Sequence, residues 1–137
     1  MKNFMDDQDF LLSTKTGEEL FHNFAEGMPI VDYHCHISPK EIWDDKRFEN
    51  ITEVWLGGDH YKWRLMRANG VDERFITGDA PAREKFQKWA ETLGRCVGNP
   101  VFEWSHLELK RYFGYEGVLN GKTAQEVWDL ANAKLAE

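Results

Sequence analysis

The sequence predicts a mostly α-helical chain with one short β-strand, and three observations support this prediction. Helix-capping residues followed by amphipathic segments recur along the chain. Only one run, at residues 30–33, is rich in β-branched and aromatic side chains. The 137 residues, 42% of them hydrophobic, suffice for a buried core. Because a lone strand leaves its backbone groups unpaired, we expect this strand to belong to a larger sheet supplied by sequence outside this chain.

The first predicted helix begins near Thr16. Thr16 and Glu19 have the spacing of a capping box, in which each side chain bonds a backbone N–H at the start of a helix. Apolar side chains then share one face, and Gly27 suits the left-handed end of a helix. The predicted strand Ile30–Tyr33 follows, and it leads directly into a His-Cys-His sequence at residues 34–36.

Every helix predicted after this strand has its own start signal. The signals are Ser38, Asp59, Asp79, Asn99 and Thr123, and a short helical turn is also predicted at Thr52–Leu56. In the helix that follows Asp79, the side chains of Phe86, Trp89, Ala90 and Leu93 are spaced for one buried face. No internal repeat or low-complexity tract interrupts this pattern.

Composition and charge exclude several classes of partner. The net charge of −7 argues against nucleic acid, because phosphate binding needs a concentrated basic face. No apolar signal stretch opens the sequence, and no run approaches the roughly 20 apolar residues of a membrane span. Cys35 and Cys96 are too few for a disulfide framework. We therefore expect a cytoplasmic protein that binds neither nucleic acid nor membrane.

The strongest local signal for chemistry is the pair His34 and His36. Alternate residues of a strand point to the same face, so both imidazoles can reach one ion. Neutral imidazole is a good ligand for zinc and similar divalent metals. The pair also follows the predicted strand, and the ends of barrel strands are where α/β barrels keep their chemistry. The alternative interpretation is a pair of hydrogen-bonded histidines at a strand end.

A second dense segment runs from Trp55 to Arg67. Two glycines before a helix start allow the backbone to approach an anionic ligand. Tyr61 and Arg64 are three residues apart and share a face of the predicted helix, and they offer donors to hydroxyl and carboxylate groups. Lys62 and Trp63 are expected to turn elsewhere, one to solvent and the other to packing. The alternative is an amphipathic helix with a solvated basic face.

Taken together, these blocks resemble the uronate (glucuronate) isomerase family, a branch of the amidohydrolase superfamily. The similarity covers almost the whole chain in the same order, and the segment 57–64 is its most specific part. One departure is Glu103, which stands where the family pattern has a histidine. The matching segments are residues 4–5, 9–12, 29–36, 55–64, 66–70, 77–78, 84–86, 98–100, 106–109 and 112–114.

The resemblance implies a distorted (β/α)₈ TIM barrel with extra helices inserted after its first strand. On that template the chain is a single N-terminal segment, with a leading helix in residues 1–28, barrel strand one in residues 29–37 and a helical insertion in residues 38–137. The rest of the barrel and the catalytic residues are expected to lie outside the chain, so the segment alone should be inactive. Among the residues present, His34 and His36 would bind a divalent metal such as zinc, and Tyr61 and Arg64 the uronate.

The implied reaction interconverts an aldose and a ketose, D-glucuronate with D-fructuronate and D-galacturonate with D-tagaturonate. A base must move the C2 proton to C1, and an electrophile must stabilise the developing oxyanion. Two alternatives stay open from the sequence: a metal-dependent hydrolase of the amidohydrolase type, and a helical structural or interaction module without activity. The preferred metal, the favoured uronate and the formation of a homo-oligomer are also open.

Overall fold

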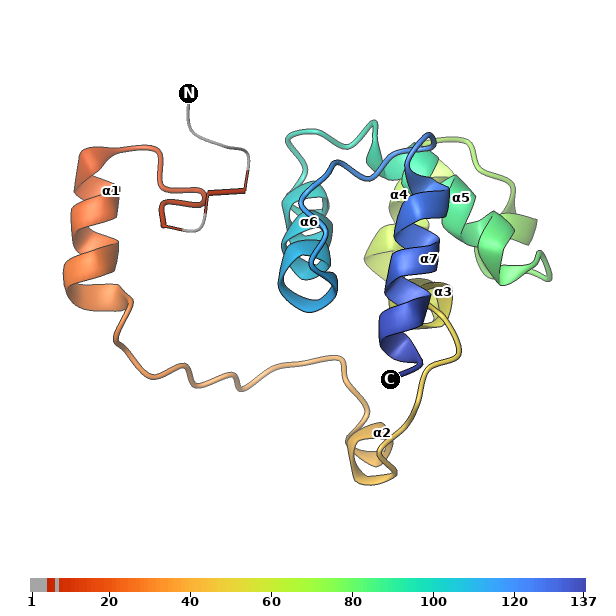
Figure 1. Ribbon diagram of the computed structural model, residues 1–137, viewed down its shortest axis with the longest axis horizontal. Helices are drawn as coiled ribbons and strands as arrows, with labels where there is room; N and C mark the ends of the chain where they lie inside the picture. Colours follow the sequence, from red (N-terminus) through yellow and green to blue (C-terminus); the bar gives the residue numbers. More distant parts are fainter. Residues whose placement is uncertain (1–4, 7) are drawn as a thin grey trace. The chain divides into compact units, whose positions relative to one another are not determined.

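The structure is a computed structural model that describes residues 5, 6 and 8–137. It contains two compact units, Met1–Lys46 and Arg47–Glu137, and each is described by itself. Helices are the only regular elements within the described residues, as Figure 1 shows. The prediction of a mostly helical chain is therefore confirmed. The predicted division at residues 28 and 37 is a different partition, which this structure does not test.

Among its described residues the first unit has three short helical elements: α1 (Lys15–Leu20), the π-helix η1 (Phe21–Ala25), which continues α1 directly, and α2 (Pro39–Trp43). The N-cap of α1 is Thr14, and the prediction of Thr16 is wrong. Thr14 has the extended backbone that an N-cap requires, and its hydroxyl accepts a hydrogen bond from the Gly17 N–H at 3.0 Å. Gly27 does not adopt a positive φ, so it is not a left-handed helix end.

The predicted strand at Ile30–Tyr33 is not confirmed by this structure. Residues 29–36 have no regular structure and form no ladder with any described residue. Ile30 is 92% exposed and Tyr33 is 96% exposed, although such a run is typical of a strand buried on both faces. A strand needs a neighbouring strand for its N–H and C=O groups, and the described part of this unit provides none.

The second unit is built from five α-helices and one short 3₁₀-helix. They are α3 (Ile51–Leu56), α4 (His60–Ala68), η2 (Glu73–Phe75), α5 (Ala82–Leu93), α6 (Pro100–Phe113) and α7 (Ala124–Leu135). No helix in the described ranges is long and apolar enough to cross a membrane.

Local sequence sets both ends of α6. The Asn99 side chain accepts a hydrogen bond from the Val101 N–H at 3.0 Å, and proline occupies the first helical position. Gly114 ends the helix in the left-handed conformation, with φ of 71°. An L-residue with a side chain rarely adopts this conformation, so glycine is the favourable choice. These bounds agree with the helix predicted to begin at Asn99.

Two predicted caps of the second unit are wrong, and in the first unit the Ser38 side chain makes no cap hydrogen bond to α2. The residue before α5 is Pro81, and no side chain caps the helix, so Asp79 has no such role. Thr123 precedes α7, but its hydroxyl makes no bond to the helix. It donates instead to the Val118 carbonyl at 2.8 Å and accepts from the Asn120 N–H at 2.9 Å. A threonine hydroxyl can bond the preceding loop as readily as the following helix, and here the loop contacts prevail.

The core of the second unit forms around α5, which packs against α3, α4 and α7. Its predicted face is confirmed, because Phe86, Trp89, Ala90 and Leu93 are all fully buried. The Phe86 ring lies 6.2 Å from the Trp55 ring of α3 and 5.6 Å from the Trp128 ring of α7, measured between centroids. One face of α5 therefore packs against α3, α4 and α7. Apolar side chains spaced three and four residues apart are expected to form such a face.

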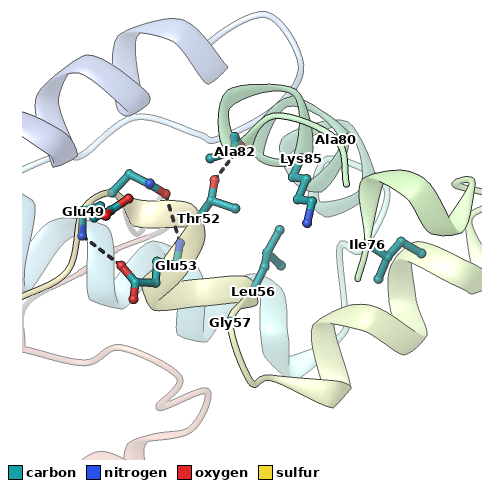
Figure 2. Close-up of a pocket in the computed structure, with 10 residues that line it drawn as sticks. Glu49, Thr52, Glu53, Leu56, Gly57, Ile76, Ala80, Ala82 and Lys85 are labelled. Carbon is teal, nitrogen blue, oxygen red and sulfur yellow. Dashed lines mark hydrogen bonds between the residues drawn. The ribbon is translucent and has the colours of Figure 1, made fainter. Parts of the chain in front are cut away.

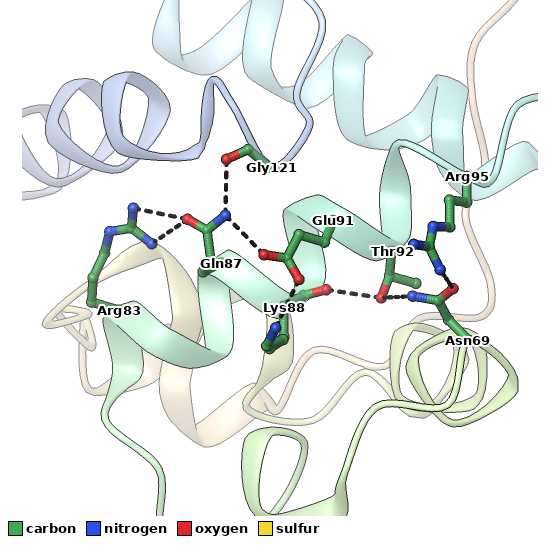
Figure 3. A network of polar contacts seen from close by, with 8 residues as sticks. All are labelled: Asn69, Arg83, Gln87, Lys88, Glu91, Thr92, Arg95 and Gly121. Carbon is green, nitrogen blue, oxygen red and sulfur yellow. Dashed lines mark hydrogen bonds and ion pairs between the residues drawn. The ribbon is translucent and has the colours of Figure 1, made fainter.

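A polar network runs along the other side of α5 (Figure 3). Gln87 donates to the Gly121 carbonyl at 2.8 Å and to Glu91 at 3.1 Å. Further along, the Thr92 hydroxyl accepts from the Asn69 side-chain amide at 3.1 Å, which ties the end of α4 to α5. Thr92 is buried, and its own hydroxyl proton goes to the Lys88 carbonyl. The network fixes α5 to the elements on both sides of it.

His106, in the middle of α6, has the structural role predicted from its apolar neighbours. Its side chain is 1% exposed, and its Nε2 accepts a hydrogen bond from the Leu119 N–H at 2.9 Å. The other ring nitrogen, Nδ1, must therefore carry the proton in the neutral ring, and it lies 2.6 Å from the Phe102 carbonyl oxygen. Burial lowers the pKa of His106, opposed by the hydrogen bond to Phe102 and the charge of Glu103.

Candidate functional site

The two histidines of the first unit converge on one point. Their Nε2 atoms are 3.0 Å apart, and the ring centroids are 5.0 Å apart with the planes at 69°. The His34 N–H donates to the Asp32 carboxylate at 3.1 Å. Both imidazoles are exposed. The convergence predicted for these side chains is thus present even though the segment is not a strand.

This convergence fits a divalent metal. Two nitrogens that each lie about 2.0–2.1 Å from one tetrahedral zinc ion are about 3.4 Å apart. The observed 3.0 Å between the Nε2 atoms of His34 and His36 is a hydrogen-bond distance, as in the alternative interpretation of the pair. It is a few tenths of an ångström shorter than the spacing around zinc, so one ion could bind both nitrogens after the rings move slightly apart. Within the described residues no group of three or more His, Cys, Asp and Glu side chains gathers around an ion position. Among the described residues, His34 and His36 would thus supply two of the four ligands that such a site needs.

The second candidate group lies at the corner between α3 and α4. Asp59 is the N-cap of α4, as predicted, and its Oδ1 accepts from the N–H groups of Tyr61 at 2.9 Å and Lys62 at 3.2 Å. Burial alone would raise the pKa of Asp59, but the hydrogen bond and charge of Lys62 and the two N–H donors hold it below its usual range. The carboxylate is therefore ionised at neutral pH, where it stabilises the start of the helix.

Tyr61 and Arg64 share the outer face of α4. Tyr61 is half exposed, and the Arg64 guanidinium carbon lies 5.1 Å from the centre of the Tyr61 ring. Arg64 has no carboxylate partner among the residues that the structure describes. A phenol and an unpaired guanidinium side by side can bind a hydroxyl and a carboxylate of one ligand.

The other two basic groups of α4 are already engaged. Arg67 forms a two-point ion pair with Glu73, with Nε to Oε2 at 2.8 Å and Nη2 to Oε1 at 2.5 Å. The bonds from Arg67 and then from Thr77 lower the pKa of Glu73 to about 2. Lys62 is bound to Asp59. Of the four donors of the segment, Lys62 and Arg67 are thus engaged in ion pairs, whereas Tyr61 and Arg64 are in no ion pair with a described residue.

The prediction that one of Lys62 and Trp63 faces solvent is wrong. Lys62 is only 8% exposed, and its ammonium lies 2.5 Å from Asp59 Oδ2 and 5.9 Å from the centre of the Trp55 ring. Trp63 is half-buried and donates from its indole N–H to the Leu56 carbonyl at 2.8 Å. Opposite charges three residues apart in the sequence were a signal for this ion pair. They could not reveal that the ammonium is buried.

Two pockets open on the second unit, and neither includes Tyr61 or Arg64. The smaller, of about 350 Å³, is shown in Figure 2, with Lys85 pointing into it from α5 and Glu53 at the side of α3. The Lys85 ammonium donates to the Gly78 carbonyl at 2.6 Å. The larger pocket, of about 530 Å³, has a mostly apolar lining of Phe48, Val54, Trp55, Glu108, Tyr112, Phe113, Lys134 and Leu135.

Comparison with known proteins decides the family. A model of the glucuronate isomerase family matches residues 1–137, the whole of the sequence. The chain belongs to the glucuronate isomerase family. The uronate isomerase of Lachnospira eligens is 71% identical over all 137 residues, and that of Endomicrobium trichonymphae is 65% identical over the same length. The matched region is the N-terminal part of these enzymes and about 29% of their length.

A solved structure supports the same assignment. The crystal structure of uronate isomerase from Thermotoga maritima matches with a TM-score of 0.86 and 41% sequence identity. The match covers 94% of this chain and 28% of that one. The resemblance inferred from the sequence motifs is therefore confirmed, and the hydrolase and non-enzymatic alternatives are not favoured. The histidine pair and the Tyr61–Arg64 pair lie in different units of this family member.

Proposed function

We propose that this chain contributes the N-terminal part of an aldose-ketose isomerase that interconverts D-glucuronate with D-fructuronate and D-galacturonate with D-tagaturonate. The observation that carries the proposal is the match of all 137 residues to uronate isomerases, at up to 71% identity. Because the chain spans about 29% of the length of those relatives, we place the base for proton transfer in the remaining part. The proposed setting is the cytoplasm, and a homo-oligomer is compatible with it.

In this proposal the residues of the chain bind and orient the metal and the substrate. They do not move the proton. His34 and His36 would hold a divalent metal such as zinc, with ligands from the rest of the enzyme completing the site. When bound, the metal supplies a positive charge that stabilises the developing oxyanion or orients the sugar oxygens. Tyr61 donates to a substrate hydroxyl, and Arg64 pairs with the uronate carboxylate. Each of these donors is present on the exposed face of α4.

A chimeric enzyme tests the proposal. This chain replaces the matching 137 residues of the Lachnospira eligens uronate isomerase, and isomerisation of glucuronate and galacturonate is measured. We expect kcat/KM within about tenfold of the unmodified enzyme, because most substitutions away from a site change little. The isolated chain serves as the control and should show no activity. A chimera that folds, binds metal and fails to isomerise either sugar would refute the proposal.

Substitution of Tyr61 or Arg64 tests the proposed contacts with the substrate. In the chimera, Tyr61→Phe and Arg64→Met should each lower kcat/KM for glucuronate by roughly 10- to 150-fold, the effect of losing about 1.5–3 kcal/mol of charge-assisted hydrogen bonding. The melting temperature should stay near that of the parent chimera, because both side chains are exposed.

Matched controls separate binding from general effects of the substitutions. Arg67→Met changes the same residue type on the same helix, but Arg67 is already paired with Glu73. Tyr112→Phe removes a hydroxyl from a tyrosine of α6 that is 70% exposed. Both controls should keep the parent kcat/KM. Equal kinetics for Arg64→Met and Arg67→Met would make the outer face of α4 a solvated surface without a binding role.

A further inference from the structure

Lys62 is unusual in the second unit because its charged side chain is buried. Lysine is almost never fully buried unless it is paired, and here 92% of the residue is removed from solvent. Exchanging a buried ion pair for apolar side chains of similar volume is often neutral or stabilising, so such a pair is weak evidence for a role in stability. Because Lys62 is adjacent to Tyr61 on α4, we consider a role in placing that side chain rather than in stability.

The carboxylate of Asp59 connects Lys62 to Tyr61. The Lys62 ammonium holds Asp59 Oδ2 at 2.5 Å, and Oδ1 of the same group accepts the Tyr61 N–H at 2.9 Å. One Asp59 oxygen therefore bonds the buried side chain of Lys62, and the other bonds the backbone N–H of Tyr61. A shift of this carboxylate moves the first turn of α4, and with it the Tyr61 side chain.

The same ammonium also links α4 to α3. It lies 5.9 Å from the centre of the Trp55 ring, and Trp55 is 3% exposed and bonded through its indole N–H to Glu108 at 2.7 Å. The Trp63 indole adds a second link, to the Leu56 carbonyl. Two glycines, at residues 57 and 58, separate these helices, and a glycine pair by itself does not fix the angle of a corner.

We propose that Lys62 is a positioning residue: its buried ammonium fixes the Asp59 cap against Trp55 and thereby sets the orientation of Tyr61 and Arg64 toward the uronate. This inference rests on the proposed function of Tyr61 and Arg64. Lys62 itself does not contact the substrate, because its ammonium points into the corner between the helices. It acts through the geometry of the first turn of α4.

The chain contains a closely matched control. Lys88 of α5 also bonds a carboxylate three residues away, Glu91 at 2.9 Å, and it also lies 5.9 Å from an aromatic ring, that of Phe75. Lys88 is much more exposed than Lys62, and it lies on a different helix from Tyr61 and Arg64. Lys88→Met thus removes an ion pair and a cation–π contact of the same kinds, at a residue for which no positioning role is proposed.

The experiment measures kcat and KM for glucuronate in the chimera with Lys62→Met and with Lys88→Met. A misplacement of about 1 Å at a binding group can cost up to 100-fold, so we expect Lys62→Met to lower kcat/KM by about tenfold or more, mainly through a higher KM. Lys88→Met should match the parent. If Lys62→Met fails to fold, Asp59→Asn replaces it, because asparagine keeps the helix cap and loses the ion pair. The same rise in KM is expected.

A combined substitution shows whether Lys62 acts through Tyr61 and Arg64. In the Tyr61→Phe/Arg64→Met background, Lys62→Met should add less than twofold to the loss, because both contacts that it positions are already gone. Full additivity, or a Lys62→Met enzyme as active as Lys88→Met, would overturn the inference while leaving the binding role of Tyr61 intact. If Tyr61→Phe and Arg64→Met both keep the parent kcat/KM, the proposed substrate contacts fail and the positioning role fails with them.

Discussion

Replacing His34 with alanine in the chimeric enzyme is expected to abolish stoichiometric metal binding and to lower kcat/KM by at least about 100-fold. The loss of even an outer-shell partner of a metal ligand typically costs about 10- to 100-fold in affinity or activity, and a direct ligand should cost more. His36→Ala should have the same effect, because the Nε2 atoms of the two side chains converge to 3.0 Å. The measurement is metal content by elemental analysis, alongside kcat/KM.

His22→Ala is the control for this experiment. His22 belongs to the same unit, and its ring bonds Asp9 at 3.0 Å and Glu26 at 3.1 Å, so it is held in an arrangement unrelated to the predicted metal position. Metal content and activity should be unchanged in this variant. The isolated chain should bind zinc weakly, because two imidazoles supply too few ligands. Unchanged metal content in His34→Ala and in His36→Ala would place the metal elsewhere in the enzyme.

His106→Ala is expected to destabilise the second unit by about 3 kcal/mol, a large part of the stability of a small domain. The substitution leaves the Leu119 N–H without its acceptor in a buried place, and it opens a cavity beside the Phe102 ring, whose centroid lies 4.3 Å from that of His106. Thermal unfolding of the isolated chain should show a melting temperature lower by about 10 °C or more. A change of only a few degrees would mean that the hydrogen bond contributes little.

The pH dependence of the same unfolding follows from the lowered pKa of His106. Below the usual histidine pKa of 6.5 the unfolded chain binds a proton at this ring that the folded chain does not bind. The stability contributed by the neutral ring is therefore fully present above pH 6.5 and is lost as the pH falls below it. Wild-type protein should lose stability between about pH 7 and 5 in part through this residue, and His106→Ala should show a shallower slope there. Equal slopes would assign the pH dependence to other groups.

Much of the second unit could be predicted because its signals are local. Asp59 and Asn99 start helices through hydrogen bonds to N–H groups two or three residues away, so the sequence around each is sufficient. The buried face of α5 follows from the spacing of its apolar side chains. The pairing of Tyr61 with Arg64 follows from helical geometry once the start at Asp59 is known. In each case the interaction spans less than about two helical turns.

In the candidate site, too, the arrangement of side chains close together in the sequence was predictable. The two histidines converge because residues two apart in an extended chain point the same way, and they do so without a regular strand. By contrast, the paired state of Arg67 depends on Glu73 in η2, a different element. Sequence alone could name four possible donors on α4. It could not separate the two that are free for a ligand from the two that are engaged.

The sequence by itself determined the family, the positions of the caps at Asp59 and Asn99, and the histidine pair, because each depends on residues close together in the chain. Tertiary structure alone decided the burial of Lys62, which requires the Trp55 ring of the preceding helix, and the use of the Thr123 hydroxyl, which bonds the loop before α7. It also left Ile30–Tyr33 without regular structure in this chain. The physical reason is that a strand needs hydrogen-bond partners from elsewhere in the chain, whereas a helix satisfies its backbone within itself.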